Sequence, residues 1–173
     1  QTILLCHCLL IYVVINEVLS SKKLSSRPFL IGISGHSGVG KTSLSEIIKN
    51  IFGKNQTQLV HGDDNHRWER GHEKWSEYTH LNPKANNLYK EIYNVNQLVK
   101  GKPINRKHYN HNTGKFDDNQ LIYPKNLMIF EGLHTLFLSQ LNKELDLKIY
   151  VEAEESLREF WKIGRDSKKR NQN

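Results

Sequence analysis

The stretch FLIGISGHSGVGKT, residues 29–42, decides the fold class of this 173-residue chain. Residues 29–34 form a short, mostly apolar run, which is typical of a strand buried on both faces of a parallel sheet. Residues 35–42, GHSGVGKT, follow directly and satisfy the phosphate-loop pattern G-x-x-x-x-G-K-S/T. The apolar residues after the loop share one face of a helix that Gly53 can end: Leu44, Ile47, Ile48 and Ile51. Strand, glycine-rich loop and helix, in this order, are the context that the pattern requires.

The chemistry of such a loop follows from its residue types. Glycines allow backbone N–H groups to turn inward around phosphate oxygens, and the helix N-terminus adds its partial positive charge. Lys41 is expected to place its ammonium group on the β- and γ-phosphates, and Thr42 to offer its hydroxyl to Mg²⁺. We therefore predict a nucleoside triphosphate site made by Gly35, His36, Ser37, Gly38, Val39, Gly40, Lys41 and Thr42.

Three further apolar runs predict strands, and two of them lead to carboxylates. Residues 58–61 run directly into a segment that holds Asp63, and residues 124–133 contain Glu131. Residues 146–151 predict a fourth strand. Parallel strands bring their carboxyl ends to one edge of a sheet, where ligands bind in open α/β folds. Between the second and third strands a helix face is marked by Leu88, Ile92, Val95 and Val99, and Gly101 and Pro103 can end that helix.

The composition indicates a globular domain with an excess of positive charge, which favours negatively charged partners. Hydrophobic residues make up 37% and charged residues 25%, which is the mix of a globular domain and excludes collagen-like and disordered chains. Lys and Arg number 25 against 18 Asp and Glu, so the formal net charge is +7. Such an excess attracts nucleic acid, acidic membrane surfaces or phosphorylated small molecules.

Other classes of phosphate-loop protein fit the sequence less well. A signalling GTPase needs N-K-x-D to recognise guanine, and here Asn142, Lys143 and Asp146 are one residue too far apart. A D-x-x-G switch is also expected after a strand, whereas this chain has Glu131 followed by Gly132. A DNA-remodelling ATPase is usually larger and lines a groove with interleaved basic and aromatic residues. We therefore expect a small-molecule kinase with no nucleic-acid partner.

The first 27 residues differ from the rest of the chain. Residues 3–15 form a run of 13, interrupted in polarity by His7, which is shorter than the roughly 20 apolar residues of a membrane span. No basic start of a secretory signal precedes this run. A truncated anchor or signal, an extra core element and an upstream extension foreign to the domain remain open, and the last is favoured. Residues 20–27 then form a linker, so that residues 1–27 are a separate segment and residues 28–173 the kinase domain.

The two cysteines of the chain do not suggest an oxidising compartment. Cys6 and Cys8 lie two residues apart, flank His7 and form no disulfide framework. A metal site at these three residues would need at least one further ligand. We expect a cytoplasmic protein with no membrane partner.

From about Phe29 to Arg170 the chain resembles the phosphoribulokinase/uridine kinase family, and within it the phosphoribulokinases more closely. Six blocks in the same order carry the resemblance: GHSGVGKT (35–42), GDDNHRWER (62–70), THLNPKAN (79–86), HYNHNTGKF (108–116), FEGLH (130–134) and FWKIGRD (160–166). The resemblance implies a three-layer α/β P-loop fold of the nucleoside-kinase type with a parallel sheet. It also implies ATP and Mg²⁺ as cofactors, and transfer of a phosphoryl group to ribulose 5-phosphate to give ribulose 1,5-bisphosphate.

The resemblance also implies roles for individual residues. Asp63 takes the position of the catalytic base and Lys41 that of the phosphate-loop lysine, while Thr42 and Glu131 would hold Mg²⁺. The positions that hold the phosphorylated acceptor and the phosphates correspond to His66, Arg70, Tyr109, His111, Lys162, Arg165 and Arg170. Bidentate contacts to phosphate favour Arg over Lys, which agrees with three of these assignments.

Two alternatives stay open at this point. A uridine kinase, or a kinase of another small acceptor, shares the overall pattern, although a basic cluster suits a phosphorylated acceptor better than uridine. A nucleotide-binding module without catalytic activity is the second alternative. The sequence stops at Asn173 directly after the basic stretch, so we expect the sheet to lack its last strand, and an exposed edge would favour homo-oligomers.

Overall fold

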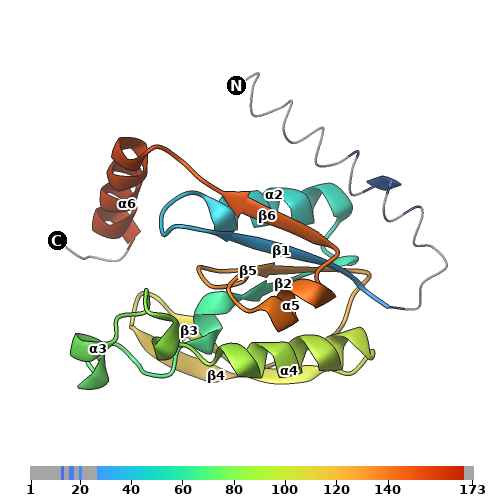
Figure 1. Ribbon diagram of the computed structural model, residues 1–173, viewed down its shortest axis with the longest axis horizontal. Coiled ribbons are helices and arrows are strands. Elements are labelled where there is room, and N and C mark those ends of the chain that lie inside the picture. Colours follow the sequence, from blue (N-terminus) through green and yellow to red (C-terminus); the bar gives the residue numbers. More distant parts are fainter. Residues whose placement is uncertain (1–12, 14–15, 18–19, 21–26, 170–173) are drawn as a thin grey trace.

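A computed structural model describes residues 13, 16, 17, 20 and 27–169 of the chain (Figure 1). The predictions for Cys6, His7 and Cys8 lie outside the described residues, as does most of the segment 1–27. In the part that is described, no helix combines the length and the apolar character that crossing a membrane requires.

Four parallel strands form the central sheet in the order β2-β5-β1-β6. The strands are β1 (Phe29–Gly35), β2 (Thr57–His61), β5 (Leu127–Glu131) and β6 (Leu147–Val151), so all four predicted strands are confirmed. β5 is shorter than the run that predicted it. Pro124 has no N–H group to donate to a ladder, and at the other end the last contact to the neighbouring strand is the N–H of Gly132 donating to the carbonyl oxygen of Ile33 on β1.

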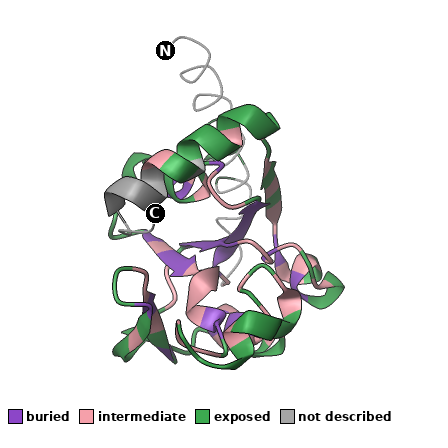
Figure 2. Cartoon of the chain, turned by 90° about the vertical axis from the view of Figure 1, so that its left-hand side faces the viewer, coloured by how far each residue is buried: buried purple, intermediate pink, exposed green. Residues whose placement is uncertain are grey.

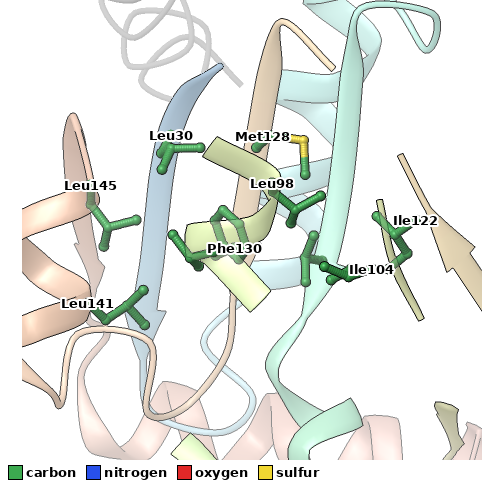
Figure 3. Close-up of a cluster of buried hydrophobic side chains, with 10 residues drawn as sticks. Leu30, Leu98, Ile104, Ile122, Met128, Phe130, Leu141 and Leu145 are labelled. Atoms are coloured by element: carbon green, nitrogen blue, oxygen red, sulfur yellow. The ribbon is translucent and has the colours of Figure 1, made fainter. Parts of the chain in front are cut away.

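Helices cover both faces of this sheet, which gives the three layers expected (Figure 1). Helix α2 (Lys41–Phe52) lies on one face, and α4 (Leu88–Val99) and α5 (Ser139–Glu144) lie on the other. Alternate residues of β1 and β5 face the two layers. Leu30, Met128 and Phe130 belong to the cluster under α4 and α5, drawn in Figure 3, whereas Ile31 and Ile129 belong to the cluster under α2. Figure 2 shows the buried strands enclosed between the largely exposed helices.

Several elements were not predicted from the sequence. They are the hairpin of β3 (Ile104–Asn110) and β4 (Lys115–Ile122), the short helix α3 (Lys74–Glu77), the helix α5, the 3-10 turns η1 (Gly62–Asn65) and η2 (Pro83–Ala85), and the helix α6 (Glu155–Lys169). α6 follows β6 and stands apart from the sheet (Figure 1).

The hairpin escaped prediction because its alternation is hidden by a charged residue. In β3 the buried positions are Ile104, Arg106 and Tyr109, and Arg106 does not count as apolar in a pattern search. The register of the hairpin also shifts between Lys107 and Tyr109, which breaks the period of two.

Replacing a side chain at the centre of the sheet should destabilise the chain strongly. Phe130 is 1% exposed, and we expect Phe130→Ala to lower the free energy of unfolding by about 3–5 kcal/mol, because it leaves a cavity between β5 and α4. Phe160 on α6 is 74% exposed, so Phe160→Ala is a matched control with a change below about 0.5 kcal/mol. Equal denaturation midpoints for the two variants would contradict this packing.

Candidate active site

The phosphate loop connects β1 to α2 at the carboxyl edge of the sheet. Gly38 and Gly40 have φ angles of 88° and 92°, a left-handed conformation that side chains other than glycine rarely adopt. Lys41 folds back over the loop, where its Nζ donates to the carbonyl oxygens of Gly35 at 3.0 Å and His36 at 2.9 Å. Lys41 therefore lies over the loop, and contact of its ammonium group with the β- and γ-phosphates stays a prediction.

Two glycines bring the ends of β2 and β5 together. A Cβ atom added to Gly62 would lie 3.0 Å from the Cα of Gly132, so the two backbones touch at a point that larger residues could not share. Asp63 follows Gly62, and Glu131 precedes Gly132. Both predicted carboxylates therefore project from the same edge of the sheet as the phosphate loop.

Glu131 is a buried carboxylate with two partners. Its Oε1 accepts a hydrogen bond from the Thr42 hydroxyl at 3.3 Å and lies 2.8 Å from Nδ1 of His61. The hydrogen bond with Glu131 raises the pKa of His61, against the opposing effect of burial. The structure thus joins Thr42 to Glu131, whose predicted role in holding Mg²⁺ stays a prediction, and it adds His61, which was not predicted from the sequence.

Thr42 and Glu131 provide the oxygen donors that suit Mg²⁺. Magnesium usually takes one or two carboxylates and completes its shell with water and substrate phosphates. Within the described ranges no group of three or more His, Cys, Asp or Glu side chains is arranged to hold a metal ion. A hydroxyl and a carboxylate beside a phosphate loop fit an ion that is held partly by the nucleotide.

Asp63 lies on η1 and faces a different set of partners. Its carboxylate is 39% exposed, and Oδ2 lies 2.9 Å from Nε2 of His111, in the turn after β3. Partial burial opposes ionisation, but the hydrogen bond with His111 and the charges of His66, His111 and His80 outweigh it. Together they hold the pKa of Asp63 well below its usual range.

Three further histidines surround the pocket beside Asp63. His66 is buried, and its Nδ1 lies 2.7 Å from Oδ1 of Asn86. His80 contacts the His66 ring with 5.8 Å between centroids, and its carbonyl oxygen lies 3.2 Å from Nε2 of His134. Burial lowers the pKa of His134. The pocket lining includes Asp63, His66, His80, Asn86, Glu91 and His134.

Sequence analysis assigned His66 but not His80, His134 or Asn86. These three residues lie in THLNPKAN and FEGLH, blocks that were used only to recognise the family. They reach the pocket only because the folded chain brings their segments beside η1, and a pattern of neighbouring residues in the sequence does not reveal such a contact. The signal in the sequence was the presence of histidines in five of the six blocks, four of which supply the histidines around Asp63.

Two other predicted acceptor residues lie near the pocket in supporting positions. Arg70 donates from its guanidinium to the carbonyl oxygen of His111 at 2.9 Å, and its side chain packs against Gly114. Tyr109 is buried, with its ring 4.7 Å from that of His66 and 5.2 Å from that of His111. Both residues therefore fix the position of His111 beside Asp63, and their contact with an acceptor stays a prediction.

The structure does not describe the side chains of the three basic residues that were predicted to contact the phosphates. Lys162 and Arg165 belong to α6, whose side chains at these positions lie outside the described residues, and Arg170 lies outside them altogether. Their predicted contact with phosphates stays a prediction.

A parallel sheet with a phosphate loop and two strand-end carboxylates defines a P-loop α/β protein. The chain belongs to the Phosphoribulokinase / Uridine kinase family, whose profile matches residues 30–173. It is 32% identical to the phosphoribulokinase of Synechocystis over 144 residues, which are 83% of this chain and 43% of the relative. A uridine kinase of Streptococcus agalactiae is 27% identical over 148 residues, covering 83% of this chain and 70% of the relative. The family resemblance is therefore confirmed.

The fold class is confirmed by solved structures. A phosphoribulokinase from Rhodobacter spheroides aligns with a TM-score of 0.66 and 22% identity, covering 84% of this chain and 58% of that one. The chain spans about two fifths of the length of its phosphoribulokinase relatives from Synechocystis and spinach, 43% and 39% respectively.

The Asp63–His111 pair should make stability depend on pH in the acid range. Because the pKa of Asp63 is lower in the folded state, its ionised form stabilises the fold above the ordinary Asp pKa near 3.9, and this contribution is lost as pH falls. The free energy of unfolding of wild type relative to Asp63→Asn should therefore shrink between pH 5 and pH 3 in denaturant titrations. Asp118 is an exposed carboxylate on the hairpin, and the free energy of unfolding of wild type relative to Asp118→Asn should stay constant over the same pH range. A constant difference for Asp63→Asn as well would contradict the ion pair.

Proposed function

We propose that this protein is a kinase that transfers the γ-phosphoryl group of ATP to a hydroxyl of a phosphorylated sugar, with ribulose 5-phosphate as the acceptor. Ribulose 1,5-bisphosphate would then be the product. The proposal rests on family membership and on the geometry of the two carboxylates. Phosphoryl transfer needs positioning and neutralisation of charge more than covalent work by the protein.

The observation that supports the proposal best is that the two carboxylates have different partners and face different parts of the site. Glu131 is tied to Thr42 of the phosphate loop, whereas Asp63 is tied to His111 and faces the histidine-lined pocket. A nucleotide-binding module needs only the first arrangement. A second carboxylate, ionised and directed to a separate pocket, is what a kinase needs in order to activate an acceptor hydroxyl.

The proposed reaction uses the residues as follows. Asp63 takes the proton of the acceptor hydroxyl while the hydroxyl oxygen forms a bond to the γ-phosphorus of ATP. The bond from that phosphorus to the β–γ bridging oxygen breaks, and ADP leaves. Lys41 binds the β- and γ-phosphates and neutralises their developing charge. Thr42 and Glu131 would hold the magnesium ion, which would neutralise further charge on the phosphates.

Preference for a phosphorylated acceptor is supported by the groups around Asp63. His66, His80, His111 and His134 surround this carboxylate and offer ring N–H groups or positive charge to a phosphate. Uridine carries no phosphate and would leave such groups without a matching partner. Lys162, Arg165 and Arg170, which were predicted to contact phosphates, would add to the same preference.

Release of ADP from Mg-ATP tests the reaction. We expect stimulation by ribulose 5-phosphate, none by uridine, and a low rate with no acceptor. Asp63→Asn should lower the acceptor-dependent kcat by about 10²–10⁴-fold, the usual contribution of a general base, with KM for ATP nearly unchanged. Asp118→Asn is the control and should retain the wild-type rate. Stimulation by uridine alone would overturn the acceptor, and no stimulation by any acceptor would overturn the reaction.

Lys41→Ala should act on the donor side. Loss of a charge-assisted contact to phosphate is worth roughly 1.5–3 kcal/mol, so the dissociation constant for ATP should rise at least about tenfold in calorimetry. Lys100→Ala, at the exposed end of α4, should bind ATP as wild type does. Equal affinities for both variants would show that the loop does not bind the triphosphate.

A further inference from the structure

A buried arginine beneath the site contacts three different elements. Arg106 lies on β3, and its side chain is 3% exposed. One guanidinium nitrogen donates to Glu91 of α4 at 2.8 Å, and another donates to the carbonyl oxygen of His61, at the end of β2, at 2.7 Å. Its Nε lies 3.6 Å from Oδ2 of Asp64 on η1, an ion pair longer than a hydrogen bond.

These contacts lie on both sides of the proposed base. His61 is two residues before Asp63, and Asp64 is the residue after it. Arg106 therefore holds the chain at the carbonyl oxygen before η1 and at the carboxylate within it. The bidentate fork of a guanidinium suits this task, because its donors point in fixed directions.

The other oxygen of Asp64 ties η1 to the same hairpin. Oδ1 accepts a hydrogen bond from the backbone N–H of Tyr109 at 2.8 Å and lies 3.1 Å from Nδ1 of His108. His111, the partner of Asp63, follows two residues after Tyr109. The Arg106 and Asp64 contacts thus fix the distance between the segment that carries Asp63 and the segment that carries His111.

We propose that Arg106 is a positioning residue for the reaction: by holding His61 and Asp64 it places the Asp63 carboxylate against His111 and into the acceptor pocket. This inference rests on the proposed function, since it assigns Arg106 to the same base. Arg106 acts through Asp63 and touches neither the acceptor nor the phosphate loop in the described contacts. Displacement of a reacting group by about 1 Å can cost on the order of 10²-fold in rate.

The conservative variant Arg106→Lys is the sharpest test. It keeps the buried positive charge, but one ammonium group cannot reproduce the directed contacts to Glu91 and the His61 carbonyl. We expect kcat to fall by about 10–100-fold while KM for ATP stays within about twofold. Arg67→Lys is the matched control, because Arg67 is an exposed arginine on the loop after η1, and it should retain the wild-type kcat.

A double-mutant cycle separates positioning from a general structural role. If Arg106 acts through Asp63, adding Arg106→Lys to Asp63→Asn should lower kcat by less than about threefold further. Multiplicative losses in the double variant would overturn the inference. Should Arg106→Lys fail to fold, Asp64→Asn tests the same link with the size of the side chain unchanged, and the same lack of additivity with Asp63→Asn is expected.

A measurement without turnover separates this inference from the proposed function. In a carboxyl ¹³C NMR titration, Asp63 should stay ionised near pH 3 in wild type and in Arg67→Lys, whereas in folded Arg106→Lys it should gain a proton near the ordinary Asp pKa of about 3.9. An unchanged Asp63 titration in Arg106→Lys would overturn the positioning role. If wild type releases no ADP with any acceptor, the proposed function fails while this titration still decides the role of Arg106.

Discussion

The parallel register of β2, β5 and β1 is the constraint on which the site depends. Glu131 of β5 is level with Ile33 of β1 and with His61 of β2, so β2 and β5 end at the same level and β1 ends two residues further on, at the same edge. The phosphate loop follows β1, and η1 follows β2. A slip of one residue in β5 would turn Glu131 to the opposite face and away from Thr42. The Gly62–Gly132 contact helps to hold this register, because a side chain at either position would push the two loops apart.

The same edge gives its two carboxylates different environments. Glu131 is buried and shared between Thr42 and His61, while Asp63 is half-exposed and paired with His111. The pairing with His111 holds the pKa of Asp63 well below its usual range, so that its carboxylate is ionised at neutral pH. A modest basicity is sufficient when the hydroxyl is held within hydrogen-bond reach. The two carboxylates therefore differ in environment and not in residue type, which agrees with the separate roles proposed for them.

Features that depend on residues close together in the sequence could be predicted, whereas features that depend on tertiary contacts could not. The phosphate loop, the four strands and the helices α2 and α4 depend on local patterns of glycine and apolar residues, and each was predicted. The hairpin depends on the buried Arg106. An arginine is expected at the surface when only the sequence is known, because its partners on α4 and η1 come from distant parts of the chain. His80 and His134 reach the pocket only through tertiary contacts, so spacing along the chain says nothing of their convergence. The prediction was strongest where a residue's neighbours are close in sequence.

The energetics of the Arg106 cluster agree with a geometric role. Removing charges from water costs several kcal/mol for each ion, and a buried ion pair is often no more stable than apolar residues of the same volume. Glu91, Arg106 and Asp64 are all nearly inaccessible to solvent, so their net contribution to stability is small even though losing one partner would be costly. An apolar cluster could fill the same space, but it would let η1 slide over the hairpin. Directed donors on a rigid fork fix that position, which is what the proposed role of Asp63 as a base would require.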